Sequence, residues 1–326
     1  MLGGLARRAA YVKNLRTQGP PFLMVDSGDL FFDVFATANS EQALTKAQLI
    51  GQAYRNMGVT AVNVGDMDLL QGVDFLRHEA SLGLPLISAN LVATGSLVPI
   101  FPPYVIREIS GLRIAFLGLL SSEFRSEVAP TIQKAIEGKV LIKDPIETAK
   151  EMVAKLRSQA DIIVLLADLS FFREREVAKA APGLPFILGG FDGGGPGRPY
   201  REGETQILSS SAKGMYISKL QGTVKNPTSP FQERGEVTRL QEQLTQIDMR
   251  IQQLKNAREK QPPQYIDSNI DRLNQQKATV QEELKRSKDF MTKSNPFLWT
   301  TISMDASLPE DKEVQEWITK AGIDKD

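Results

Sequence analysis

The stretch FLMVDSGDLF, Phe22 to Phe31, decides the fold because it combines a short apolar run with an acidic loop that contains glycine. The segment AYRNMGVTAVNVGDMD, residues 53–68, repeats this arrangement with a helix end, an apolar run and a second Gly-Asp pair. Strands that alternate with helices in this way predict a layered α/β core. Ligands of such cores bind beyond the carboxyl ends of the strands, so we expect function in these loops.

The same alternation continues toward the carboxyl end of the chain. Further apolar runs predict strands, in the order LPLISANLV, YVIREI, LRIAFLGLL, DIIVLLADL and PFILGG. After a glycine-rich segment at 193–197, TQILSSSA and GMYISKLQGTV predict two more strands that close the same sheet. The α/β domain is therefore expected over residues 1–230, with its last strand ending near Thr223.

Composition excludes several classes of function. The 39 Lys and Arg residues balance 39 Asp and Glu residues, so no net field would attract nucleic acid. The absence of Cys excludes thiolate chemistry, and the single His78 excludes a multi-histidine zinc site. No apolar run is long enough to span a membrane, and Met1 to Ala10 lacks the apolar core of a signal peptide.

A different pattern begins at Glu236. Apolar residues then recur at alternating spacings of three and four, at Val237, Leu240, Leu244, Ile247, Ile251 and Leu254. After a Gln-Pro-Pro-Gln break a second series follows, at Ile266, Ile270, Leu273, Val280 and Leu284, with Lys277 as the exception. These heptads predict an antiparallel coiled-coil hairpin over residues 231–292. Residues 293–326 predict a strand and a short helix that dock back on the core.

Eight segments in order carry a resemblance to a known family. They are GGLARRAAYVKNLR, FLMVDSGDLF, AYRNMGVTAVNVGDMD, LPLISANL, LRIAFLGLL, ADIIVLLADLS, LPFILGGFDGG and KGMYISKL. Over about residues 3–222 the chain resembles the calcineurin-like metallophosphoesterase domain of the 5′-nucleotidase (UshA-like) family. The resemblance implies an α/β fold, a four-layered α/β/β/α sandwich with its first strand missing, to which the helical hairpin is appended. It also implies two divalent metals that activate a water and clamp the phosphoryl oxygens.

The resemblance assigns candidate metal ligands. Asp29, after Gly28, stands where the family has the carboxylate that bridges both metals. Asp66 replaces a ligand Asn, and Met67 replaces a His, although a thioether cannot transfer a proton. Asp168 replaces a ligand His, and the segment Gly-Phe-Asp-Gly with Asp192 replaces the family's Gly-His-x-His. The family's opening Asp-x-His strand has no counterpart in the given residues, and no catalytic residue is assigned.

Two interpretations of these carboxylates remain open. Three carboxylates in one pocket repel one another unless a cation, a basic side chain or protonation relieves them. In the first interpretation Asp29, Asp66 and Asp168 form a remodelled site for one hard cation, Mg²⁺, Mn²⁺ or Ca²⁺, because oxygen ligands suit these ions. In the second they are ordinary loop residues that serve turns and helix caps.

Function is predicted from the loss of the family's histidines. We expect a phosphoesterase-fold protein with an eroded dimetal centre, acting as a non-catalytic binding or assembly module of the cell envelope, since the family is exported. The alternative is an active metal-dependent phosphoesterase that uses the substituted Asp ligands. In a third interpretation the hairpin, residues 236–288, is the working part and binds a protein partner or a second copy. No nucleic-acid partner is expected.

Overall fold

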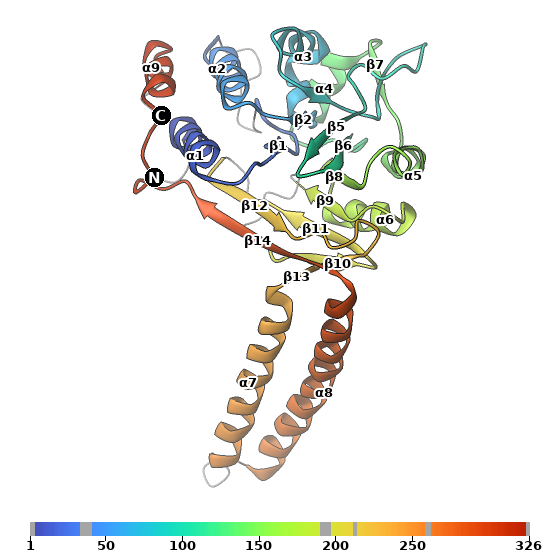
Figure 1. The fold of residues 1–326 in the computed structure, drawn as a ribbon, viewed down its shortest axis with the longest axis vertical. Coiled ribbons are helices and arrows are strands. Elements are labelled where there is room, and N and C mark those ends of the chain that lie inside the picture. Colours follow the sequence, from blue (N-terminus) through green and yellow to red (C-terminus); the bar gives the residue numbers. More distant parts are fainter. Residues whose placement is uncertain (1–3, 33–40, 190–196, 211–213, 258–261, 324–326) are drawn as a thin grey trace. The chain divides into compact units, whose positions relative to one another are not determined.

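The computed structural model describes residues 4–32, 41–189, 197–210, 214–257 and 262–323. The chain forms two compact units (Figure 1). The first contains Met1–Lys219 and Thr300–Asp326, and the second contains Leu220–Trp299. The backbone therefore passes between the units twice.

A small parallel sheet forms the first layer of strands in the first unit. Its order is β1 (Val25–Asp26), β2 (Ala61–Asn63) and β3 (Leu86–Ile87). All three residues of β2 are buried. The helices that share a hydrophobic core with this sheet are α1 (Leu5–Gln18), α2 (Glu41–Met57), η1 (Met67–Gln71), α3 (Gly72–Ser81), α4 (Ala129–Ile136) and α9 (Lys312–Lys320).

The second sheet of this unit has six strands. Their order is β10 (Tyr200–Glu202), β11 (Thr205–Ser209), β9 (Phe186–Gly189), β8 (Ile162–Asp168), β6 (Leu112–Leu120) and β5 (Tyr104–Ile109). The inner four strands are parallel, and both edge strands are antiparallel to their neighbours. Helices α5 (Pro145–Leu156) and α6 (Phe171–Ala180) pack on this sheet around a second core. A separate antiparallel pair joins β4 (Leu91–Ala93) to β7 (Val140–Ile142).

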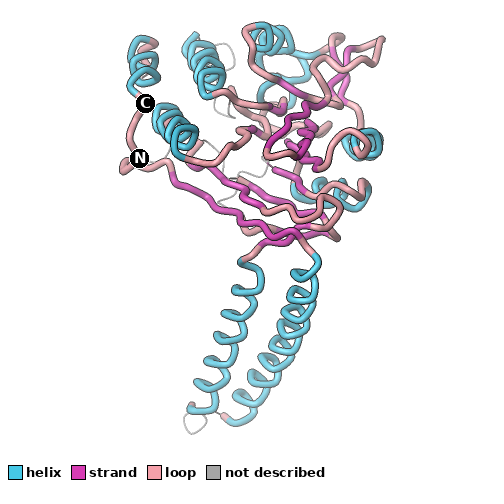
Figure 2. Tube along the Cα trace, viewed as in Figure 1, coloured by secondary structure: helices cyan, strands magenta, loops and turns pink. Residues whose placement is uncertain are grey.

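The two larger sheets of the first unit pack against each other, because β2 contacts both β6 and β8. Each sheet has its own helices and its own hydrophobic core, which gives the layer order helix, sheet, sheet, helix (Figure 2). Residues 162–168 of β8 are all buried, as expected for a central strand covered on both faces. The predicted four-layered α/β architecture is confirmed.

Local signals place the start of α6 directly after β8. The Ser170 side chain accepts a hydrogen bond from the N–H of Arg173 and so caps the helix. Only Leu169 and Ser170 separate the strand from the helix. Asp168, the last residue of β8, is therefore held at the carboxyl edge of the sheet between two rigid elements.

One strand prediction is wrong. TQILSSSA forms β11 in the six-stranded sheet as expected, but GMYISKLQGTV forms β12 (Tyr216–Gly222), which lies in another sheet. That sheet has the order β12, β14 (Asn295–Ser303), β13 (Phe231–Glu233). The free edge of β11 is taken by β10, so the six-stranded sheet offers β12 no place there. The partner of β12 comes from residues more than 70 positions later in the chain.

The second unit is built around helices α7 (Gly235–Asn256) and α8 (Pro263–Lys293), which contact each other. Their buried contact residues belong to the predicted heptad series and are Ile247, Ile251 and Val280, flanked by the half-buried Leu240, Leu244, Ile270 and Leu273. Lys277, the exception in that series, forms an ion pair with Asp248. The helices connect β13 to β14, and these two strands are parallel. A tight turn cannot join parallel strands, so the chain needs an excursion of this kind.

The carboxyl-terminal helix α9 (Lys312–Lys320) lies in the first unit. The Asp311 carboxylate accepts the N–H groups of Glu313 and Val314, which fixes where the helix begins. Val314 is fully buried, and α9 contacts α1 and α2. Among the described helices, none is both long and apolar enough to cross a bilayer.

Candidate metal centre

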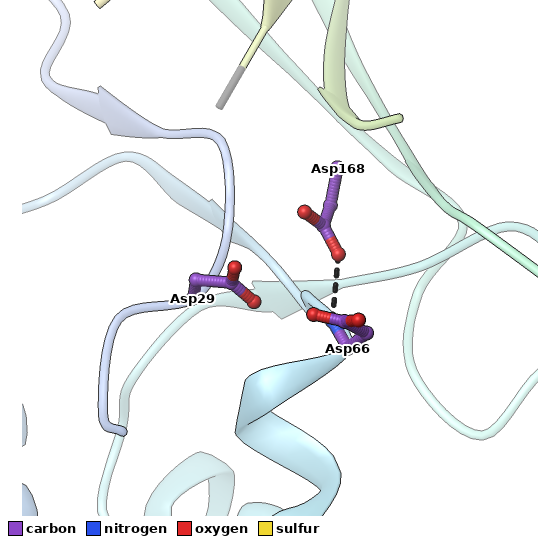
Figure 3. Close-up of side chains that lie close together, drawn as sticks. All are labelled: Asp29, Asp66 and Asp168. Atoms are coloured by element: carbon purple, nitrogen blue, oxygen red, sulfur yellow. Dashed lines mark hydrogen bonds between the residues drawn. The ribbon is translucent and has the colours of Figure 1, made fainter. Parts of the chain in front are cut away.

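Three of the predicted ligands lie together. Asp29, Asp66 and Asp168 each offer a carboxylate oxygen, and these oxygens lie within 4.8 Å of one another (Figure 3). Asp29 follows β1, Asp66 follows β2, and Asp168 ends β8, so strand ends from both sheets contribute. Asp66 and Asp168 are buried, and the side chain of Asp29 is 19% exposed. The fourth predicted ligand, Asp192, lies outside the described residues.

Glycine at two positions allows the acidic loops to approach closely. Gly28 has φ 117°, and a Cβ built on it would lie 2.9 Å from the backbone N of Gly65. A Cβ on Gly65 would lie 2.3 Å from Oδ1 of Asp29. Asp29 itself has the left-handed φ of 57°. A side chain at Gly28 or at Gly65 would therefore separate the two loops. Their close contact brings Asp29 toward Asp66.

Asp68, which the sequence analysis did not identify, holds the two loops together. Its Oδ2 accepts the N–H groups of Asp29 at 3.0 Å and of Gly65 at 2.9 Å, and its Oδ1 accepts that of Phe31 at 3.0 Å. Burial and the neighbouring charge of Asp29 raise the pKa of Asp68 well above its usual range. The position of Asp68 in the Gly-Asp-Met-Asp segment could have predicted this role, because Asp near a turn commonly accepts hydrogen bonds from backbone N–H groups.

Asp168 contributes a buried carboxylate whose hydrogen bonding is incomplete. Its Oδ2 accepts the N–H of Asp66 at 2.6 Å, the bond drawn in Figure 3. Its Oδ1 is buried and has no hydrogen-bond partner among the described residues. Burial, with the charges of Asp29 and Asp66, raises the pKa of Asp168 well above its usual range. An unpartnered buried oxygen is costly, and a cation would relieve that cost.

An arginine lies among these carboxylates. Nη1 of Arg125 is 2.8 Å from Oδ2 of Asp29 and 2.8 Å from Oδ1 of Asp66. Burial and the charge of Asp66 raise the pKa of Asp29 to about 6, although Arg125 acts in the opposite direction. Burial also raises the pKa of Asp66 against the effect of Arg125. A basic side chain was one predicted way to relieve the repulsion, but the residue that does so was not identified from sequence.

Among the described residues, no histidine lies with the three carboxylates. Met67, at the position of a family His, is 1% exposed and packs in the core of the first sheet. His78 lies on α3 and is exposed. Neither residue can act as an acid or base at the carboxylates.

The donor set that the described residues provide does not fit a two-metal centre. It offers carboxylate oxygens only, and two of the three carboxylates already bond the guanidinium of Arg125. The same oxygens fit a single hard cation in chemical type, since Mg²⁺, Mn²⁺ and Ca²⁺ prefer oxygen ligands. Such an ion and the guanidinium would need the same oxygen atoms.

Comparison with known proteins agrees with the fold. No model of a known protein family matches the chain. The chain is 26% identical over 181 residues to a 2′,3′-cyclic-nucleotide 2′-phosphodiesterase/3′-nucleotidase of Salmonella typhimurium, covering 50% of this chain and 27% of that protein. It is 24% identical over 259 residues to Protein UshA of Yersinia enterocolitica, covering 68% and 46%. The chain thus spans less than half the length of these relatives.

A solved structure gives the same result. The calcineurin-like phosphoesterase YfkN of Bacillus subtilis superposes with a TM-score of 0.62 at 17% identity, covering 98% of this chain and 88% of that one. The predicted resemblance is therefore confirmed at the level of the superfamily and its fold.

Proposed function

We propose that this chain, which has the calcineurin-like phosphoesterase fold and UshA-like nucleotidases among its relatives, is a non-catalytic binding or assembly module of the cell envelope. One observation carries the proposal: the Arg125 guanidinium bonds two of the three carboxylates on which a catalytic metal would depend. Hydrolysis in this superfamily fold requires metal ions that activate a water and stabilise the phosphoryl oxygens. A guanidinium cannot lower the pKa of a water by coordinating it.

The replacement of the family's His supports the same conclusion, because no histidine lies among the described residues of the cluster. The alcohol of a phosphate ester leaves more readily when an acid protonates or stabilises its oxygen. The position that resembles the family's His is the buried thioether of Met67. The oxygen donors would suit one hard cation, Mg²⁺, Mn²⁺ or Ca²⁺, and Arg125 stands in its place.

The envelope location rests on the resemblance to an exported family. The binding role draws on the second unit, where α7 and α8 bury only part of their heptad residues against each other. Their length exceeds the average of about 11–12 residues for globular helices. We propose that this hairpin binds a protein partner or a second copy of the chain.

The alternative is an active metal-dependent phosphoesterase that uses the substituted Asp ligands. Oδ1 of Asp168 favours it, because this buried oxygen lacks a partner that a metal would supply. The printed names of the relatives also describe phosphodiesterases and nucleotidases.

A turnover assay separates the two candidates. The chain is assayed at pH 7.5 with millimolar Mn²⁺ or EDTA on p-nitrophenyl phosphate, a 5′-nucleotide and a 2′,3′-cyclic nucleotide. At this pH Asp29, with a pKa of about 6, is ionised, so a negative result cannot be caused by its protonation. We expect no Mn²⁺-dependent turnover above that of Asp29→Asn. Turnover that depends on Mn²⁺ and disappears in Asp29→Asn, while Asp74→Asn on the surface retains it, would establish the enzyme instead.

A further inference from the structure

We infer that Arg125 is a resident cation that occupies the place of a metal ion, so that removing its charge creates a site for one hard divalent cation. The ligands of that site are Asp29, Asp66 and Asp168. The inference rests on the proposed non-catalytic role, but it is tested by ion binding rather than by turnover.

The first support is convergence on one atom. A single nitrogen, Nη1 of Arg125, lies 2.8 Å from an oxygen of Asp29 and 2.8 Å from an oxygen of Asp66. Two carboxylates that meet at one cationic atom have the arrangement that they would adopt around an ion. Metal–oxygen bonds of 2.0 to about 2.6 Å are shorter, so the oxygens would need to close inward only slightly.

The second support is the orientation of each carboxylate. In all three, one oxygen is held by a backbone N–H: Asp29 by Met67 at 3.0 Å, Asp66 by Arg125 at 3.4 Å, and Asp168 by Asp66 at 2.6 Å. The other oxygen of Asp29 and of Asp66 bonds the guanidinium. Metal ligands are typically fixed in this way by hydrogen bonds from outside the coordination sphere.

The third support is the oxygen that the guanidinium does not satisfy. Oδ1 of Asp168 belongs to a residue that is 1% exposed, and it has no hydrogen-bond partner among the described residues. In Figure 3 this oxygen lies on the side of Asp168 that faces Asp29. It is the third donor that an ion would use and that Arg125 leaves without a bond.

Arg125 and Asp29 are the members of the cluster that reach the surface. Their side chains are 20% and 19% exposed, whereas those of Asp66 and Asp168 are buried. The loop that carries Arg125 follows β6, so the side chain can turn outward without disturbing a strand. An ion can then replace the guanidinium. The ion and the guanidinium cannot bind Asp29 and Asp66 at the same time.

The test compares melting temperatures in EDTA with those in millimolar Mg²⁺, Mn²⁺ or Ca²⁺. For wild type and for Arg125→Lys, which keeps the charge, the melting temperature in each ion should equal that in EDTA. The melting temperature of Arg125→Met should be about 5 to 10 °C higher than in EDTA when its preferred ion is present at ~100 times the Kd. Arg113→Met is the matched control. It removes an equal charge from a surface ion pair, in which Arg113 lies 3.0 Å from Asp161, and its melting temperature should not respond to the ions.

A second variant protects the test against misfolding. Arg125→Gln removes the charge but keeps amide donors for the carboxylates, and it decides the outcome if Arg125→Met does not fold in any condition. Folding of either variant only with an ion supports the inference, as does Mn²⁺ affinity at least ten-fold above wild type by titration calorimetry. The inference is overturned if wild type binds an ion as tightly as the variants, or if neither neutral variant responds to any ion. Ion binding by wild type without turnover would leave the proposed function standing.

Discussion

Asp68 shows how one side chain can position a whole site. Its carboxylate accepts three backbone N–H groups from the loops that carry Asp29 and Asp66. The acidic loops therefore keep their geometry through a residue that is itself too deeply buried to meet solvent or ligand.

Replacing Asp68 with Ala should lower the free energy of unfolding by about 2 to 4 kcal/mol. Three buried N–H groups would lose their acceptor, which costs more than is gained by removing the repulsion between Asp68 and Asp29. Urea denaturation measures the change. Asp74→Ala, an exposed acid on α3, is the control and should leave stability unchanged. Equal stability of the two variants would show that the three bonds contribute nothing.

For single residues, the sequence predicted the three carboxylates but not Arg125, the cation that bonds two of them. Asp29, Asp66 and Asp168 were assigned to one site through the family resemblance, and the structure brings an oxygen of each within 4.8 Å of the others. Arg125 lies 59 residues after Asp66, in the segment SSEFRSEV, which shows neither helical nor strand periodicity. Whether a loop arginine turns inward depends on the path of that loop in three dimensions, and no local pattern encodes it.

Among the elements, the hairpin was easy to predict and its neighbours were not. Its heptads are a local pattern, and Ile247, Ile251 and Val280 are buried as that pattern predicts. The pairing of β13 with β14 joins residues on either side of the hairpin, and β12 joins the same sheet. Such pairings are non-local, so the strand after residue 214 was assigned to the wrong sheet.

The hairpin should fold without the rest of the chain. A fragment of residues 235–293 is expected to show a helical circular dichroism spectrum with a cooperative thermal transition, because α7 and α8 bury their own seam. Ile251→Ala should destabilise it by about 2 to 4 kcal/mol, since a buried side chain leaves a cavity. Gln252→Ala, on the exposed side of the same helix, should not. A random-coil spectrum would refute the prediction.

At the scale of the whole molecule, three hydrophobic clusters of the described residues each lie within a single unit. The buried clusters around the two large sheets contain residues of the first unit, while Ile247, Ile251 and Val280 form a cluster within the second. Unfolding of one interior therefore need not unfold the other. The four-layered core was predicted through resemblance, since the alternation of strands and helices alone does not specify how strands divide between two sheets.

Exchanging residues 235–293 for a linker of eight Gly and Ser residues should preserve the first unit. Because Phe231 lies opposite Asn295, Arg234 is level with Leu298. A linker from Arg234 to Ser294 must therefore cross one strand spacing and step back about four residues, which eight residues can span. Scanning calorimetry should show the main transition within a few degrees of wild type. Val314→Ala, which opens the core near α9, serves as a sensitivity control and should lower that transition. Loss of the transition after the exchange would show that the hairpin is needed to fold the core.

Arg125 also has a consequence for the conditions under which this protein keeps its shape. A free ion reaches a site in proportion to its concentration in the surroundings, and it is lost on dilution or to a chelator. A guanidinium joined to the same chain is present at an effective concentration fixed by its tether, which for short connections is in the millimolar range or above. If Arg125 occupies the place of an ion as inferred, the charge balance around Asp29 and Asp66 is inherited with the sequence, and we expect it to be the same in metal-poor and metal-rich surroundings.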